Sequence, residues 1–418
     1  MKNFRIVDES GDFFGSIFIE NGFIKEIFSG AVNLPDADII VDSSGFAPSA
    51  VLMPAFIDLH AHFRDPGFPE KEFAFPSESV QSASLAAVSG GFTTVVCMAN
   101  TKPAIDTFVK ARALKDRSDA LGLIDLYPVL SLSKNMEGRE LSGIRDLLRA
   151  DKESVYNLPL MLSEDGMDVV DDDLFYLAMR EARRLGIPVS CHCDLGGEAY
   201  AVRRAIGIGK KAGCHVHIAH VSTGETVEII RKAKKNAAAE NGFILTCEAT
   251  PHHIGATEAD ARRMGVESFG RVNPPLRSEV DRQAIITAIG DGTIDAVATD
   301  HAPHSEEDKA AGSPGFTGLE TAFSACLTCL VSGNELCKIS RLLSAAPAQI
   351  LGLEDRGRVA QGLRADLVIV DTHATWRVEP ERFKSRGKCS PFTGRELTGK
   401  VLMTFNAGRI VFWEDRIA

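Results

Sequence analysis

The sequence predicts an α/β protein, a (β/α)8 TIM-type barrel with a small composite β-sandwich domain formed by both termini. Three observations lead to this fold class. Apolar strand-like runs alternate with helical patterns in the middle of the chain, short strands separated by turns occupy both ends, and 418 residues suit one large barrel with a satellite domain. A doubly wound open sheet is the alternative, but no glycine-rich phosphate loop follows the first strand.

The predicted β-sandwich consists of residues 1–50 and 355–418. Near the N-terminus, Asn21-Gly22 lies between two apolar runs and marks a tight hairpin. Near the C-terminus, the stretch 400–412 is typical of a second hairpin. Neither end has enough apolar residues for a core of its own, so we expect the two ends to combine into one domain.

The predicted barrel spans residues 51–354. Helical patterns such as Ser77–Gly90 and Leu174–Leu185 lie between its strands. Active sites of such barrels lie at the carboxyl ends of the strands, so polar residues at those ends are candidates for function. The eight expected strands are 51–58, 92–98, 124–130, 158–162, 187–191, 215–219, 243–248 and 294–298.

Composition narrows the possible functions. Hydrophobic residues make up 44% and charged residues 25% of the chain, as in soluble globular proteins. The net charge of −11 argues against nucleic-acid binding, and no basic block suggests a membrane surface. No signal-peptide core or 18-residue apolar span is present, so we expect a cytoplasmic protein. The nine cysteines lack paired metal-finger spacing and are expected to be reduced.

Histidines and aspartates gather at the ends of the predicted strands. His60 and His62 alternate along the end of the first strand, so both side chains point the same way. Because the carboxyl ends of all eight strands meet at one mouth of the barrel, we expect the strand-end residues to converge there. Four imidazoles and two carboxylates belong to this set: His60, His62, Asp165, His192, His220 and Asp300.

These side chains indicate a metal site. Imidazole and carboxylate without thiolate suit Zn²⁺, with other divalent first-row ions as alternatives. A catalytic zinc keeps about three protein ligands, so six ligands predict two zinc ions per subunit that share a bridging carboxylate. Asp58 lies on the same strand face as both histidines. We expect its carboxylate to accept a hydrogen bond from one of the two rings and so to fix the tautomer of that ring.

Four further histidines are expected to have other roles. His215 and His217 share a parity opposite to that of His220, so we expect them to point toward the surrounding helices and to be structural. His252 and His253 follow the seventh predicted strand, where lining the site and a purely structural role are both open.

Seven stretches combine these residues into a specific pattern: "DLHAHFRDPG", "VVCMANTKPAID", "SEDG", "HIAHVST", "TPHH", "RVNPPLR" and "ATDHAPH". Over nearly the whole chain they resemble a class I dihydroorotase of the amidohydrolase superfamily. The resemblance implies reversible, zinc-dependent hydrolysis of (S)-dihydroorotate to N-carbamoyl-L-aspartate in pyrimidine biosynthesis. It also implies a barrel with a composite β-sandwich.

The resemblance further assigns roles to single residues. The more buried ion would be bound by His60, His62 and Asp300, and the second by His192 and His220. Asp165 would bridge the ions. It is chosen over Glu164 because it precedes His192 by 27 residues, the spacing usual in the family. Asp300 would also accept a proton from the attacking water and pass it to the departing nitrogen.

The same resemblance assigns the substrate contacts. The substrate carboxylate would be bound by Arg64, Asn100 and His304, and the ring by Asn273. The stretch 302–318 is polar and glycine-rich, and we expect a loop that closes over the substrate. A small-molecule substrate is thus expected, with a homodimer and a possible complex with aspartate transcarbamoylase.

The chain departs from the family pattern in one substantial way. Only 28 residues separate His192 from His220, fewer than the family generally has, which would change oligomer contacts or access to the site. Another cyclic amidase, a hydantoinase or allantoinase, is one alternative. Its usual carbamylated lysine is absent from Leu158–Ser163. A non-catalytic scaffold for a transcarbamoylase is another alternative, but such a scaffold would be free to lose the ligands that this chain keeps.

Overall fold

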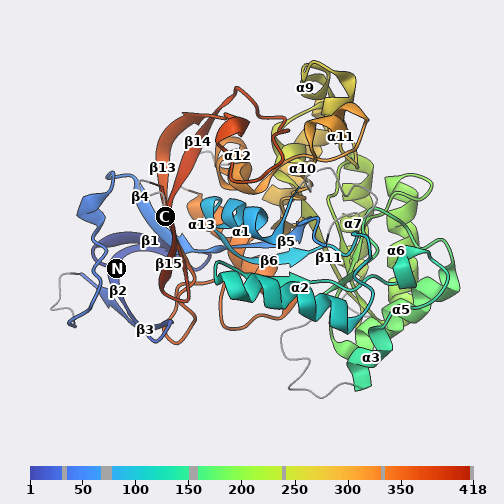
Figure 1. Ribbon diagram of the computed structural model, residues 1–418, viewed down its shortest axis with the longest axis horizontal. Helices are drawn as coiled ribbons and strands as arrows, with labels where there is room; N and C mark the ends of the chain where they lie inside the picture. The colour runs from blue at the N-terminus through green and yellow to red at the C-terminus, as the bar shows by residue number, and fades with distance from the viewer. Residues whose placement is uncertain (31–34, 67–77, 150–158, 238–241, 331–334, 415–418) are drawn as a thin grey trace.

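The computed structural model describes residues 1–30, 35–66, 78–149, 159–237, 242–330 and 335–414. A barrel and a sheet built from both chain ends make up the molecule. In Figure 1 the terminal sheet lies to the left, with both chain ends, and the helices of the barrel extend to the right. Within the described ranges, no helix combines the length and the hydropathy that crossing a membrane requires.

The barrel is formed by two parallel sheets that join edge to edge. One contains β5, β6 and β7, and the other runs from β8 to β12. Parallel bridges between Leu130 and Leu162 and between Ala61 and His301 close the ring. The predicted (β/α)8 barrel is therefore confirmed. Its strands are β5 (Phe56–Ala61), β6 (Phe92–Cys97), β7 (Asp125–Pro128), β8 (Leu162–Ser163), β9 (Val189–Cys191), β10 (His215–Ile218), β11 (Ile244–Ala249) and β12 (Ala296–Val297).

Helices follow most of these strands and begin and end at recognisable caps. The side chain of Asp171 accepts hydrogen bonds from the first turn of α5, which ends at the left-handed Gly186. The main helices are α1 (Val80–Ser89), α2 (Phe108–Leu121), α3 (Ile144–Arg149), α5 (Asp172–Leu185), α6 (Glu198–Ala212), α7 (Gly224–Ala237), α10 (Glu279–Gly290), α12 (Ala322–Leu330), α13 (Leu336–Ser340) and α14 (Ala346–Leu351). Three further short helices are α8 (Pro251–Gly255), α9 (Glu258–Arg262) and α11 (Glu306–Ala310).

The terminal strands form one seven-stranded sheet in the order β15-β14-β13-β4-β1-β2-β3. β4 joins the two chain ends, because it pairs with β1 on one side and with β13 on the other. The predicted Asn21-Gly22 hairpin connects β2 and β3. The strands are β1 (Phe4–Asp8), β2 (Gly11–Glu20), β3 (Phe23–Ser29), β4 (Ala50–Pro54), β13 (Leu367–Arg377), β14 (Glu396–Asn406) and β15 (Arg409–Trp413).

The expected strand 51–58 is wrong as a single element. It is divided between β4 in the terminal sheet and β5 in the barrel. The chain changes partners at Ala55, whose N–H donates to Asp366 O, while the next N–H, of Phe56, donates to Gly91 O. Both halves are buried, so the hydropathy pattern carries no sign of the break. We propose that the boundary between terminal sheet and barrel lies at Ala55.

Two expectations extend beyond the described residues. Residue 158 of the expected fourth strand lies outside them, and the described strand is the short β8. Ser77 of the expected helix 77–90 also lies outside them, and α1 begins after its N-cap, Ser79. The stretch expected as a closing loop contains α11.

The terminal segment is attached at the amino ends of the barrel strands. Arg356 is buried there and contacts Asp125 at 2.6 Å and Asp366 at 3.5 Å. Its Nη1 also donates to Thr94 of β6 at 2.9 Å. The segment between β13 and β14 reaches the opposite end of the barrel, where Ser385 Oγ donates to Glu78 and Thr317 N–H donates to Cys389 O.

Candidate metal centre

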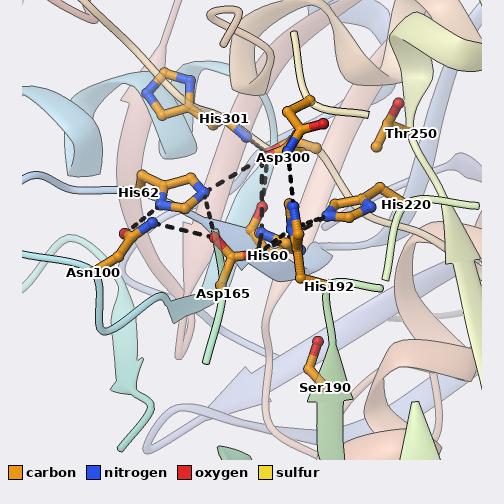
Figure 2. Close-up of polar contacts among 12 residues, drawn as sticks. His60, His62, Asn100, Asp165, Ser190, His192, His220, Thr250, Asp300 and His301 are labelled. Atoms are coloured by element: carbon orange, nitrogen blue, oxygen red, sulfur yellow. Dashed lines mark hydrogen bonds and ion pairs between the residues drawn. The ribbon is translucent and has the colours of Figure 1, made fainter. Parts of the chain in front are cut away.

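The strand ends bring together all six predicted metal ligands. Each is at most 8% exposed. Figure 2 shows their side chains facing one another, while the ring of His301 lies apart from them. The six residues are His60, His62, Asp165, His192, His220 and Asp300.

Two groups of three ligand atoms lie close enough to hold an ion. The first contains His60, His62 and Asp300, and the second contains His60, Asp165 and His220. Within each group the ligand atoms lie within 4.8 Å of one another. His192 belongs to neither group, but its Nδ1 lies 2.9 Å from Nε2 of His220.

Asp165 occupies the middle of the cluster. Its Oδ1 is 3.1 Å from His60 Nε2 and 3.3 Å from His192 Nδ1, and its Oδ2 is 3.4 Å from His62 Nε2. The neighbouring Glu164 turns away and accepts hydrogen bonds from the backbone N–H groups of Leu132 and Ser133. A carboxylate with imidazoles on both sides is suited to bridging two cations.

The arrangement of the ring nitrogens fits a divalent cation. Nε2 of His60 is buried without a hydrogen-bond partner among the described residues, although it lies near the carboxylates of Asp165 and Asp300. A ring nitrogen of His192 and a ring nitrogen of His220 face each other. In a hydrogen bond between them only one of the two carries the hydrogen, so the other is unprotonated. Unprotonated imidazole nitrogens that converge with carboxylate oxygens make a donor set suited to zinc.

Both carboxylates are held in the charged form that metal binding requires. Burial raises the pKa of Asp165 and of Asp300, but the surrounding imidazoles outweigh it and hold both pKa values below the ordinary range. The strongest opposing contributions come from His60 at Asp165 and from His62 at Asp300.

The carboxylate that holds an imidazole is Glu248, and the expectation for Asp58 is wrong. No imidazole ring of the described residues contacts Asp58. It accepts hydrogen bonds from the N–H of Thr299 at 2.8 Å and from its hydroxyl at 2.5 Å, and so fastens β5 to β12. Glu248 on β11 instead contacts Nδ1 of His60 at 3.1 Å. Burial raises the pKa of Glu248, but hydrogen bonds from His217 and His60 lower it to about 2. In the sequence, the signal for this role is that Glu248 is a lone acidic residue in the largely apolar expected strand 243–248.

His215 and His217 also lie elsewhere than expected. They point into the barrel and not toward the helices, because the residue between them, Val216, packs against Gly209 of α6. β10 ends at Ile218, and His220 has a positive φ of 31°. Strand alternation therefore does not extend to His220, and its parity gives no information about the two earlier histidines.

The predicted substrate contacts line the edge of the cluster. Arg64 is 8% exposed and lies 3.2 Å from His304 Nε2, which is also 2.9 Å from the carbonyl of Pro314. A ring nitrogen that donates to this carbonyl cannot also accept from Arg64, so one of the two contacts is not a hydrogen bond. Among the described residues, no ion pair joins Arg64 to a carboxylate.

The two asparagines contact the predicted metal ligands. Asn100 Oδ1 lies 2.8 Å from His62 Nδ1, and its Nδ2 donates to Asp165 at 3.2 Å. Asn273 Nδ2 lies 3.0 Å from His192 Nε2. Each amide can therefore orient an imidazole as well as meet a substrate.

The two histidines after β11 differ from each other. His253 is fixed by Thr250 at 2.8 Å and by the carbonyl of Pro274 at 3.1 Å, which is a structural role. His252 is buried against the Phe316 ring, and its Nε2 has no hydrogen-bond partner among the described residues.

Known proteins resemble the chain over its full length. Residues 51–411 match the model of the Amidohydrolase family. A dihydroorotase from Clostridium botulinum is 37% identical, with 99% of this chain and 98% of that protein covered. A dihydroorotase from Aquifex aeolicus is 34% identical, with 99% and 98% covered.

Solved structures share the fold. An L-hydantoinase from Arthrobacter aurescens matches with a TM-score of 0.83 and 24% identity, over 100% of this chain and 96% of the other. A D-hydantoinase from Thermus sp. matches with a TM-score of 0.83 and 21% identity, with the same coverage. At these identities the likeness shows the fold alone.

Proposed function

The chain belongs to the amidohydrolase family and, within it, to the dihydroorotases, and we propose that it hydrolyses dihydroorotate reversibly to N-carbamoyl-L-aspartate. This reaction is a step of pyrimidine biosynthesis. The observation that carries the proposal is the position of Arg64, a buried guanidinium two residues beyond His62 of the metal cluster. A site that combines a hydrolytic metal centre with an anion-binding group suits a cyclic amide that carries a carboxylate.

We assign two zinc ions to the cluster. His60, His62 and Asp300 would hold one ion and His192 and His220 the other, with Asp165 between them. The group of His60, His62 and Asp300 supports the first ion. The second group contains Asp165 and His220 but shares His60 with the first, and His192 joins it through its contact with His220. When bound, the ions would polarise the ring carbonyl and lower the pKa of a water molecule.

Asp300 would move the proton. Water adds its oxygen to the ring carbonyl carbon, and the bond from this carbon to the ring nitrogen breaks. Asp300 would accept the proton that the water loses and return it to the nitrogen. Its pKa lies below the ordinary range, so the carboxylate is charged at neutral pH, as a proton acceptor must be.

Arg64 would select the substrate through its carboxylate. A guanidinium presents a planar fork of N–H groups that matches a carboxylate. His304 lies beside Arg64, and the amide of Asn100 would complete the pocket. A neutral hydantoin would leave the buried guanidinium without an anionic partner among the described residues, which is unfavourable.

The test is dihydroorotate hydrolysis by the purified protein before chelation, after chelation and after zinc is restored. We expect turnover that chelation abolishes and zinc restores, and no comparable turnover of hydantoin or allantoin. Turnover of hydantoin without turnover of dihydroorotate would contradict the proposed substrate. A protein that binds zinc but turns over none of the three would contradict the enzyme assignment.

The remaining parts of the proposal concern assembly. We propose a homodimer in the cytoplasm, able to associate with aspartate transcarbamoylase, as the dihydroorotase family suggests. Sedimentation of the pure protein, alone and mixed with the transcarbamoylase of the same organism, tests both. A monomer at every concentration would contradict the dimer.

A further inference from the structure

A line of hydrogen bonds runs through the barrel interior from His60 to His215. Glu248 contacts His60 Nδ1 at 3.1 Å with one carboxylate oxygen and His217 Nε2 at 3.0 Å with the other. The hydroxyl of Thr246 lies 2.9 Å from His217 Nδ1 and 2.8 Å from His215 Nε2. The line therefore connects the predicted metal cluster with β10 and β11 below it.

Hydrogen-bond chemistry fixes the direction of every contact in this line. A carboxylate only accepts, so His60 Nδ1–H and His217 Nε2–H must both donate to Glu248. A neutral His217 then has a bare Nδ1, which accepts from the Thr246 hydroxyl. The oxygen of Thr246 in turn accepts from His215 Nε2–H.

This direction determines which nitrogen of His60 is free. Because Nδ1 carries the hydrogen, a neutral His60 has a bare Nε2. That nitrogen faces Asp165 at 3.1 Å and Asp300 at 3.7 Å, and it lacks a hydrogen-bond partner within the described ranges. A bare nitrogen aimed at two carboxylates is what a shared cation requires of its imidazole ligand.

We propose that Glu248 is a positioning residue, held in place by His217 and Thr246, that fixes His60 in the tautomer and orientation needed to bind a cation. The burial of the group supports this role, since Glu248 and His217 are 0% exposed and bulk solvent does not reach the carboxylate. The inference rests on the proposed metal-dependent function.

The first experiment measures zinc affinity by competition with a chromophoric chelator in wild type, Glu248→Gln, Thr246→Val and the control Glu78→Gln. Glu78 is a matched control, because it is also 0% exposed and also contacts an imidazole, that of His301 at 3.3 Å, which is not a predicted ligand. A glutamine at 248 offers one acceptor to two N–H groups, so one imidazole loses its partner or changes its tautomer.

We expect Glu248→Gln to weaken zinc binding about 10- to 100-fold, the range found for partners behind metal ligands, and Thr246→Val to weaken it less. Zinc affinity in Glu78→Gln should match the wild type, whatever its stability. Equal loss of affinity in Glu78→Gln and Glu248→Gln would reduce the role of Glu248 to general stability and overturn the inference. So would an unchanged affinity in Glu248→Gln.

The second experiment needs no variant at Glu248 and therefore does not depend on its folding. Nitrogen-15 spectra of the histidine rings in the zinc-loaded wild type should show the hydrogen on Nδ1 in His60 and on Nε2 in His217. An Nε2–H tautomer in His60 would overturn the inference. Both experiments are made without substrate. A failure to hydrolyse dihydroorotate would overturn the proposed function alone, whereas a wild-type protein that binds no zinc would overturn both.

Discussion

The amide oxygen of Asn100 lies 2.8 Å from Nδ1 of His62, and the amide nitrogen donates to Asp165 at 3.2 Å. One side chain thus orients two predicted ligands of the metal cluster. Asn100→Ala is expected to lower kcat and zinc affinity about 10- to 100-fold, because His62 loses the acceptor that fixes its ring. Parallel measurement of kcat, KM and bound zinc checks this. A variant with normal zinc affinity and a raised KM alone would limit Asn100 to substrate binding.

Asp300→Asn is expected to lower kcat about 100- to 10,000-fold, because an amide cannot accept the proton that the reaction transfers. The variant should remain folded, since the amide has the size of the carboxylate. Steady-state rates and a thermal unfolding curve measure the two properties. Wild-type turnover in this variant would exclude Asp300 as the base.

Arg64→Ala is expected to raise KM for dihydroorotate more than it lowers kcat. A hydrogen bond to a charged group contributes about 1.5–3 kcal/mol, which corresponds to roughly 10- to 150-fold in binding. Arg64→Lys should recover part of the loss, because it keeps the charge but not the planar fork. An unchanged KM in Arg64→Ala would contradict the carboxylate assignment.

Glu320 predicts a pH dependence of stability. Burial raises its pKa from 4.5 to about 7, although the N–H groups of Lys384 and Ser385 donate to it. A raised carboxyl pKa stabilises the folded state below the unfolded pKa, and this contribution is lost as the pH rises through about 7. The wild type should therefore lose more Tm than Glu320→Gln between about pH 5 and about pH 8. Identical pH profiles of Tm in the wild type and in Glu320→Gln would contradict the raised pKa of Glu320.

Lys309 organises the stretch that was expected to close over the substrate. It is 1% exposed, and its Nζ donates to the carbonyls of Arg271, Ser313 and Gly315. Lys309→Met leaves these acceptors without their donor, and we expect a loss of about 1–3 kcal/mol in unfolding free energy. We also expect a raised KM, because Pro314 contacts His304 within the same loop. Urea unfolding and steady-state kinetics check both effects. An unchanged KM would show that the loop does not contribute to substrate binding.

The sequence predicted the barrel well because buried parallel strands are continuous apolar runs. The same property concealed the break at Ala55, since strands of two different sheets follow each other there without a polar residue between Ala50 and Ile57. Only hydrogen-bond partners that are distant in the sequence, such as Asp366 and Gly91, distinguish the two strands.

The metal cluster was predictable because strand ends of a closed barrel converge regardless of sequence separation. The residues that orient the predicted metal ligands were not predictable in this way. Asp58 and Glu248 are both buried carboxylates on barrel strands, but Glu248 contacts the ring of His60 whereas Asp58 accepts from its backbone N–H and from Thr299. The orientation of His217 depends on where β10 ends, a boundary that strand periodicity does not locate.

The position of β4 between β1 and β13 has a consequence for biosynthesis. A ribosome releases β1 to β4 first, and the edge of β4 waits for β13 until the whole barrel has been made. An unpaired strand edge is a site of mispairing and aggregation. The sheet that contains β4 is therefore completed only after the barrel has been synthesised, and a product truncated before Leu367 should aggregate even though it contains all six predicted metal ligands.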